Sequence, residues 1–521
     1  MKRKILSTAL MFLMILFSFP SISFAMTYRD NVVRITSANG IGITGGTYTL
    51  NELSITSGQD PNGYNYAGKQ YTLFNQELSF TVGRSGSSAV ATWFNSRMSG
   101  YNNPSVNGDR TTFDEAAGNL NFAFVGDLSL TVTNNDYPNG MTITFPNIGI
   151  AQGSTWLSNN WWFGQVTGQH TRDSDGPYTI LAFGKDANGN DVYASFLRGS
   201  NSVNEIVLER LLVIGSARST NAKLSNVETV FASLPTDGTQ VNLSGFPGSY
   251  DPTTNHIQGY VQYKSGTGDE YPILIHSVGT ASYAHIVSGP RYSSEKWGFK
   301  TYLENWRHPG GSTLIGDYLL VPTEHDNDAH IALYDLRSLP VQELRRVESF
   351  DLYTQHKAGA IGITNYTDSY GTEYYLLIVA HLNGENSVYH IYSAPVINGL
   401  ETANFVEVGS FPLSKDFQGF GLITEQTTNK VYFVGLWSPS EGATFADYAY
   451  LYELNTNTWT LGPEIDSHHL VSYGGFAGML GVHFRYGSTA FVTSDGKLAL
   501  CATERNSVLG SSLATNDWIS Q

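Results

Sequence analysis

The sequence contains a single cysteine among its 521 residues, Cys501, which excludes an internal disulfide framework. Charged residues make up only 14% of the chain, and their balance gives a formal net charge of −16. Such a charge argues against nucleic acid and anionic membrane surfaces as partners, since both attract lysine and arginine. Beyond the N-terminal region no apolar run is long enough to cross a bilayer, so no membrane insertion is expected. The HExxH zinc pattern is also absent.

The N-terminus has the three parts of a secretory signal peptide. Basic residues occupy positions 2–4, residues 5–19 are mostly apolar, and Ser23 and Ala25 place small residues at positions −3 and −1 of a cleavage site. The apolar run is short for a membrane anchor. We therefore expect a signal peptide over residues 1–25, cleavage after Ala25, and a secreted protein.

Residues 26–215 are expected to form an all-β domain of the sandwich or jelly-roll type. Residues 128–133 and 141–145 alternate between apolar and polar positions on either side of an Asn-Gly turn, and residues 178–183 and 191–196 flank a second one. Asn-Gly tolerates positive φ and is therefore typical of β-hairpins.

Two features of this domain allow more than one interpretation. Residues 205–214 fit a helix or a strand. Trp161 and Trp162 are candidate ligand-binding residues, because aromatic rings stack on the apolar faces of sugars, or else they fill the core of the domain. On a strand, neighbouring side chains point to opposite faces, so one of the two would be buried and the other exposed.

The rest of the chain is organised by a short phrase that ends in glycine. Residues 216–251, rich in Ser, Thr, Asn, Gly and Pro, are interpreted as a connection that includes a strand at 230–234. From 252 to 521 the phrase recurs at intervals of about 50 to 60 residues, which is typical of a propeller or repeat array. Its five copies are His256-Ile-Gln-Gly259, His308-Pro-Gly-Gly311, His356-Lys-Ala-Gly359, Asp416-Phe-Gln-Gly419 and Gly475-Phe-Ala-Gly478.

Each phrase is followed by a run that fits a strand and, after a turn, by a second apolar run. In the second to fourth units a third run ends in an aromatic phrase such as His390-Ile-Tyr392. No helical period intervenes, so residues 252–521 are predicted to form a five-bladed β-propeller. A strand from the other end of the chain is a plausible closure for the ring. The second runs cover residues 271–276, 318–321, 374–379, 431–434 and 498–501.

The repeat predicts two rings of side chains on one face of the propeller. The phrase opens the innermost strand of each blade, and the next strand runs back antiparallel, so its end returns to the same face. Blades repeat around an axis, which places equivalent residues around the mouth of the central channel. The first ring holds His256, His308, His356 and Asp416, and the second holds His276, Glu324, His381, Ser438 and Glu504.

Imidazoles and carboxylates that converge in this way fit three kinds of chemistry. They bind a divalent cation such as Ca, Mn or Zn, for which we single out His308, His356 and Glu324. They hydrogen-bond a polar ligand, for which His256, His276, His308, His356 and Asp416 are the candidates. They act as general acid and base, for which Glu324 and His381 are the candidates if the protein is an enzyme. The alternative is a structural role, in which each histidine hydrogen-bonds the neighbouring blade.

A second group of polar residues follows Glu324 directly. Residues 324–328, Glu-His-Asp-Asn-Asp, are followed by His330. Asp and Asn gather in turns, so a solvated turn between two strands is one interpretation, and a second cation site is the other.

The stretch from His308-Pro-Gly-Gly311 through Gly316-Asp-Tyr-Leu-Leu-Val-Pro322 and on to Ala358-Gly-Ala-Ile-Gly-Ile-Thr364 resembles a group of secreted bacterial propeller-like proteins that carry an HPGG phrase. The resemblance covers the propeller half. It implies the propeller fold and export, and it implies no particular activity.

The sequence therefore predicts a secreted protein that binds an extracellular glycan or another small polar ligand at one face of a propeller, with a divalent cation as a candidate cofactor. Two other functions stay open. One is a metal-assisted polysaccharide hydrolase or lyase. The other is a toxin-like or host-interaction protein whose N-terminal domain engages a surface.

Overall fold

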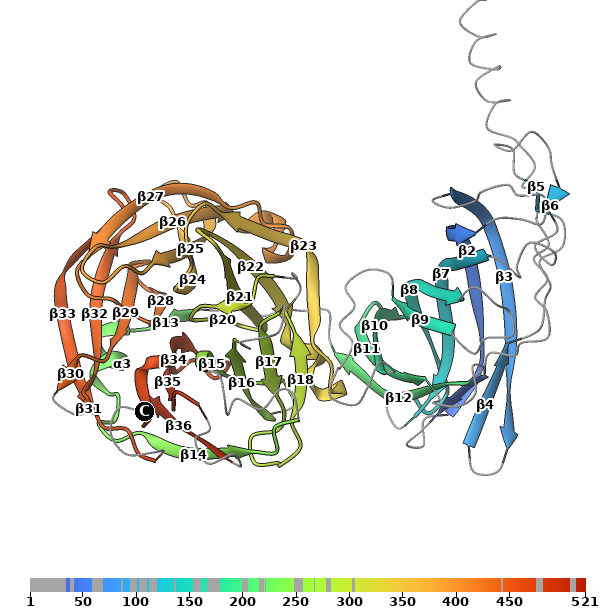
Figure 1. Ribbon diagram of the computed structural model, residues 1–521, viewed down its shortest axis with the longest axis horizontal. Helices are drawn as coiled ribbons and strands as arrows, with labels where there is room; N and C mark the ends of the chain where they lie inside the picture. The colour runs from blue at the N-terminus through green and yellow to red at the C-terminus, as the bar shows by residue number, and fades with distance from the viewer. Residues whose placement is uncertain are drawn as a thin grey trace, which may run out of the picture. The chain divides into compact units, whose positions relative to one another are not determined.

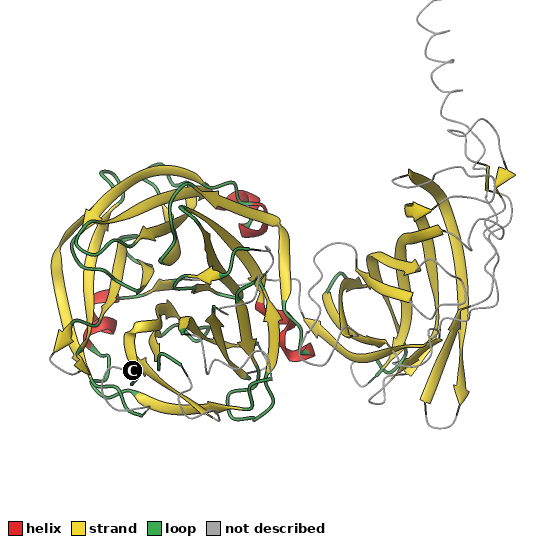
Figure 2. Ribbon diagram, viewed as in Figure 1, coloured by secondary structure: helices red, strands yellow, loops and turns green. Residues whose placement is uncertain are grey.

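The computed structural model is almost entirely β (Figure 2), which confirms the predicted all-β class. It describes the strands and some of the turns between residues 34 and 214. It also describes residues 220–521 apart from 221, 248–255, 267, 278–282, 302–304, 442–443, 475–480 and 507–511. The predicted signal peptide lies outside the described residues. Within them, no helix is long and apolar enough to cross a membrane.

The chain divides into two compact units, which we describe separately. The first contains residues up to 166 together with 182–211, and the second contains 167–181 together with 212–521. Much of the stretch interpreted as a connection, 216–251, therefore belongs to the second unit, where it supplies secondary structure to the repeat.

The first unit is built on one ten-stranded sheet with the order β10-β11-β12-β1-β4-β3-β2-β7-β8-β9. The end strand β10 also pairs with β8, so the sheet curls back on itself. The prediction of two packed sheets, as in a sandwich, is therefore replaced by one curled sheet. The strands are β1 Arg34–Ser37, β2 Gly42–Gly58, β3 Lys69–Ser85, β4 Ser88–Trp93, β7 Leu120–Thr133, β8 Met141–Gln152, β9 Trp161–Gln165, β10 Thr179–Asp186, β11 Asp191–Arg198 and β12 Glu205–Ile214, with a separate pair β5 Tyr101–Asn102 and β6 Arg110–Thr111.

Both predicted hairpins of this unit are confirmed. β7 pairs antiparallel with β8, and β10 lies beside β11. The turn glycines Gly140 and Gly189 have φ of 85°, the left-handed conformation that glycine adopts without strain. Residues 205–214 form the strand β12, which pairs parallel with β1. Trp161 and Trp162 lie on β9, and their side chains are outside the described residues, so their role stays a prediction.

The second unit contains five antiparallel sheets, one for each copy of the phrase (Figure 1). The predicted second runs are all strands, and each sheet has a further outer strand that the sequence pattern did not indicate. In chain order the sheets are β15 Ile257–Lys264, β16 Glu270–His276, β17 His285–Ser288 and β18 Trp297–Lys300; β19 His308–Pro309, β20 Thr313–Ile315, β21 Tyr318–His325, β22 Asp328–Asp335 and β23 Arg345–Thr354; β24 Ala360–Thr367, β25 Glu373–His381, β26 Ser387–Pro395 and β27 Val406–Leu413; β28 Gly419–Glu425, β29 Val431–Trp437, β32 Asp447–Asn455 and β33 Thr460–Leu470; and β34 His483–Val492, β35 Leu498–Thr503, β36 Ser512–Ile519 and β14 Thr239–Ser244.

Short elements join these sheets. The helix α3 is Val227–Ala232, and the strand β13, Lys223–Leu224, pairs parallel with β28. The remaining elements are the strand pair β30 Ser440–Glu441 and β31 Thr444–Phe445, and the 3-10 helices η4 Leu336–Val341, η5 Val396–Asn398 and η6 Leu400–Thr402.

The five sheets are arranged around a common centre. Their innermost strands β15, β20, β24, β28 and β34 contact one another in this order, and β34 contacts β15 again. The outermost strand of the fifth sheet is β14, which pairs with β36 near the end of the chain. A strand from the start of the second unit thus completes the last sheet. The sequence had suggested such a closure without establishing it.

The strand predicted at 230–234 is wrong, because these residues belong to α3 and the turn that follows it. The side chain of Asn226 accepts a hydrogen bond from the backbone N–H of Thr229, which caps the helix start. Val227 and Phe231, four residues apart, lie on one face of the helix and are buried in the core between the fourth and fifth sheets. Such a short apolar run fits either a strand or a helix by its pattern alone.

The glycine of the phrase allows the inner strands of neighbouring sheets to approach closely. The backbone N–H of Gly311 donates to the carbonyl oxygen of Gly359 at 2.8 Å, which joins the second sheet to the third. A Cβ at Gly419 would lie 2.2 Å from the hydroxyl of Ser488 and 2.3 Å from its carbonyl oxygen, in the fifth sheet. The spacing of the sheets therefore requires glycine at this position.

We expect Gly419→Ala to lower the free energy of unfolding by about 1–3 kcal/mol, the usual cost of overpacking a tight core. The matched control is Gly266→Ala, where an added Cβ meets nothing within 4 Å and φ is not positive, so little change is expected. Urea unfolding followed by tryptophan fluorescence measures both. Equal stabilities of the two variants would contradict close approach at Gly419.

Candidate functional site

The copies of the phrase converge on a cavity of about 530 Å³, which we call the central cavity, where the inner strands begin. Its lining residues come from four of the five sheets, and their side chains from the first, fourth and fifth, because the third contributes only Gly359. His256 and Gln258 belong to the first copy and Gln418 to the fourth, so the predicted convergence is found for these residues. The full lining is His256, Ile257, Gln258, Gly359, Gln418, Phe445, Arg485, Tyr486 and Arg505.

His308 of the second copy joins this cavity through Gln258. Its Nδ1 lies 2.9 Å from Oε2 of Glu324, and its Nε2 lies 2.9 Å from the side-chain amide nitrogen of Gln258. The amide nitrogen of Gln258 donates to Nε2, and Nδ1 donates to the carboxylate of Glu324. Because both ring nitrogens are engaged, His308 would have to release Gln258 before it could bind a cation.

His256 lies close to other basic side chains. Its ring centroid lies 6.2 Å from that of His308. Burial lowers the pKa of His256, and the charges of His308, Arg505 and His276 lower it further. His256 is therefore neutral at physiological pH and is able to accept a hydrogen bond as well as donate one.

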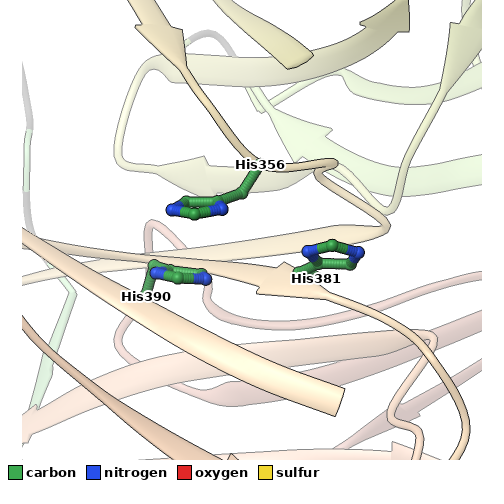
Figure 3. Close-up of side chains that lie close together, drawn as sticks. All are labelled: His356, His381 and His390. Atoms are coloured by element: carbon green, nitrogen blue, oxygen red, sulfur yellow. The ribbon is translucent and has the colours of Figure 1, made fainter. Parts of the chain in front are cut away.

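A second cluster of histidines lies on the third sheet (Figure 3). His356 precedes β24, His381 ends β25, and His390 lies on β26. One ring nitrogen from each is within 4.8 Å of the others. Glu407 accepts a hydrogen bond of 2.9 Å from Nδ1 of His390. That contact orients the ring and leaves Nε2 as its free nitrogen, the arrangement in which carboxylates support metal-binding histidines.

The rings of this cluster are close but are not arranged around one point. The rings of His356 and His390 are stacked, with centroids 3.7 Å apart and planes at 11° (Figure 3). A metal lies in the plane of each imidazole that binds it, and two such planes do not meet at one ion. The ring of His356 would therefore have to rotate before it and His390 could bind the same ion. Burial lowers its pKa, as do the charges of His390 and His381, so it offers a neutral ligand over a wide pH range.

The structure divides the predicted metal set between two places. His308 and Glu324 contact each other, whereas His356 belongs with His381 and His390. Among the described residues, the set of His356, His381 and His390 is the one whose ligand atoms come together. The predicted acid–base pair of Glu324 and His381 is separated in the same way. The reason is the register: β19 pairs His308 directly with Glu324 on β21 of its own sheet.

The other predicted ring members contact neighbouring residues of the protein. His276 is buried and lies 5.4 Å from the ring of His285. Asp416 accepts hydrogen bonds from Ser387 and Gln418, which links the third and fourth sheets. These two fit the structural role. Of the second-ring residues, Ser438 bonds the buried Asp447, and Glu504 accepts from the backbone N–H of Ala514.

The polar residues after Glu324 form a turn, which is the simpler of the two interpretations. Asp326 has φ of 53°, and the turn connects β21 to β22. His330 is buried within the second sheet and contacts Asp351. Beside the turn, Trp306 lies 5.6 Å from His325 and 6.0 Å from Tyr353, whose side chain is 54% exposed. This exposed aromatic surface is of the kind that stacks on sugar rings.

Sequence reasoning missed several residues of this face. Gln258 and Gln418 occupy the same position of two copies of the phrase, directly before its glycine, and that recurrence could have indicated them. Arg505 follows Glu504, a predicted ring position, and was not considered. Arg485 and Tyr486 lie on β34, whose phrase copy at 475–478 is outside the described residues, so no repeat position pointed to them.

No family model matches the chain, and no curated protein matches it. Solved structures with some similarity include an endo-arabinase from Bacteroides thetaiotaomicron, at 14% identity and a TM-score of 0.28 over 52% of this chain and 95% of that one. The catalytic domain of a Coprinopsis cinerea GH62 α-L-arabinofuranosidase is 10% identical, with a TM-score of 0.32 over 55% and 98%. The Dos1 propeller is 11% identical, with a TM-score of 0.22 over 76% and 88%. At these values the similarities carry no argument about ligand or activity here.

Proposed function

We propose that this is a secreted five-bladed β-propeller protein that binds a carbohydrate in the central cavity. The observation that carries the proposal is the lining of that cavity. Side chains with hydrogen-bonding groups enter it from three sheets, among them Gln258, Gln418 and Tyr486. Several convergent polar groups in a cavity of this size are typical of small-ligand sites. The exposed aromatic surface of Trp306 and Tyr353 offers a further contact for a sugar. The predicted signal peptide supports export.

A divalent cation is the second part of the proposal. The three histidines of the third sheet, with Glu407 behind His390, are the residues that would hold it. Imidazole ligands favour zinc or another transition metal over calcium, which prefers oxygen. The cation would order this edge of the face, and no chemical step is assigned to it.

Binding is tested with the purified protein on an array of neutral and acidic glycans, followed by calorimetry on the best ligand. We expect Gln258→Ala and Gln418→Ala each to weaken binding by about 2- to 10-fold, the usual worth of one hydrogen bond. The control is Gln426→Ala, an exposed residue beyond the opposite end of β28. Absence of binding to every glycan, or affinities unchanged in the double variant, would refute the proposal.

Hydrolysis is the second candidate function, because His308 and Glu324 form a hydrogen-bonded imidazole–carboxylate pair beside the cavity. Such a pair suits general acid–base catalysis. The same incubations are therefore analysed for shortened glycans. Product release that stops in Glu324→Gln, while binding persists, would replace the binding function by an enzymatic one.

A further inference from the structure

Two arginines at the central cavity have no carboxylate partner among the residues that the structure describes. Arg485 on β34 and Arg505 after β35 both line it, and both side chains are exposed. The guanidinium of Arg485 lies 5.0 Å from the ring centre of Phe445, a contact that positions the charge without neutralising it. Within the described part of the chain, neither guanidinium forms an ion pair with a carboxylate. Other arginines of this unit do, among them Arg291, Arg337 and Arg345.

The cavity has a positive charge in a protein whose net charge is −16. No aspartate or glutamate is among the described residues that line it. Neighbouring groups respond to this charge. Burial raises the pKa of Tyr486, and Arg505 and Arg485 both act to lower it. The pKa of His256 is lowered by burial first and then by nearby cationic groups. The one carboxylate in the copies of the phrase, that of Asp416, accepts hydrogen bonds from Ser387 and Gln418.

We infer that the central cavity binds an acidic saccharide and that Arg485 and Arg505 hold its oxyanion. This inference rests on the proposed carbohydrate function and names the class of ligand. Guanidinium groups match the geometry of carboxylate, sulfate and phosphate oxygens and form strong charge-assisted hydrogen bonds with them. Gln258 and Gln418 would contact the hydroxyl groups of the same sugar.

The alternative occupant, a neutral sugar, explains the cavity less well. Hydroxyl groups are satisfied by amide and imidazole partners, which the cavity supplies through Gln258, Gln418 and His256. A neutral ligand would cover two cationic groups without compensating them, which disfavours binding. An anionic group on the ligand removes that penalty, because it supplies the counter-charge that the described residues around the cavity do not.

The test compares matched ligands that differ only in charge. Calorimetry measures the binding of three kinds of ligand to the full protein. The first is oligogalacturonate with its neutral methyl ester, and the second is a sulfated and a phosphorylated oligosaccharide, each with its neutral parent. The third is inorganic sulfate and inorganic phosphate. The same titrations are made with a double variant that carries Arg485→Gln and Arg505→Gln. The control pair, Lys264→Gln with Lys497→Gln, removes two positive charges that line a separate cavity.

We expect at least one acidic saccharide to bind about tenfold or more tightly than its neutral partner, with a difference that decreases as salt is added. The arginine variants should abolish this difference and the lysine variants should retain it. Equal affinity for acidic and neutral partners, or discrimination that survives loss of both arginines, overturns the inference while the proposed function stands. Binding of inorganic anions alone, with no saccharide bound, overturns both the inference and the carbohydrate function.

Discussion

Replacing Arg291 by methionine is expected to lower the free energy of unfolding by about 3–5 kcal/mol, because it leaves a buried carboxylate without its partner. Arg291 follows β17 in the first sheet, and its guanidinium lies 2.5 Å from a carboxylate oxygen of Asp517 on β36 in the fifth. The two side chains are only 7% and 2% exposed. A second contact, 3.0 Å long, reaches Glu270. The pair therefore fastens the first sheet to the last one, where the ring is completed.

The loss should depend on pH with a defined sign. Burial raises the pKa of Asp517, and Arg291 acts against this, so its removal raises the pKa further. An acid whose pKa is higher in the folded than in the unfolded state favours folding at low pH and loses that contribution as pH rises through its folded pKa. The gap between wild type and Arg291→Met should therefore widen as pH rises through the folded pKa of Asp517 in wild type, which lies above the ordinary range of an aspartate.

The matched control is Lys264→Met. Lys264 on β15 also contacts the fifth sheet, through Asp495 at 3.9 Å, but both side chains are about half exposed. Surface pairs of this kind contribute less than about 1 kcal/mol. Urea unfolding at several pH values measures both variants. If Arg291→Met were no more destabilising than Lys264→Met, the buried pair would not hold the ring closed.

Zinc is expected to stabilise the protein and to lose that effect in His390→Ala. At a zinc concentration about 100 times Kd, binding to the folded state alone adds about 2.7 kcal/mol. His390 is the member of the trio that is buried and fixed by Glu407, so its removal leaves two imidazoles without the oriented third. The stabilisation should weaken as the solution is made more acidic, because only the neutral ring binds a metal.

The control for zinc is the double variant His468→Ala with His469→Ala, an adjacent pair on β33 outside the trio. It removes two histidines and should keep the zinc response. Thermal unfolding with and without zinc, together with direct measurement of bound metal, compares parent and variants. A parent that gains no stability and retains no zinc would show the trio to be a packed cluster of rings without a cation.

The strands of the repeat were predictable because they are fixed by local features of the chain. The second runs, such as 374–379 within β25, are continuous apolar segments bounded by turn residues, as expected for strands buried on both faces. The outer strands β27 and β33 were not predicted, because they are largely exposed and their residues do not alternate clearly. Their positions depend on pairing with the preceding strand.

The candidate site was predictable in part. Equivalence of repeat positions was enough to bring His256 to the central cavity and to place Glu324 and His381 at strand ends. It was not enough to decide which of these side chains meet. His390 is on a third strand, and its contact with His356 arises from the packing of two rings across the sheet.

By itself, the sequence determined the all-β class, the two hairpins of the first unit and the fivefold recurrence of the second, because periodicity and turn residues act over a few positions. Only the tertiary structure decided that β14 completes the last sheet, that His308 pairs with Glu324, and that Arg485 and Arg505 face one cavity. Each of these contacts joins segments far apart in the chain or side chains of different strands. Their distances are set by the register of the strands and by how the five sheets pack around a common centre, which no local pattern records.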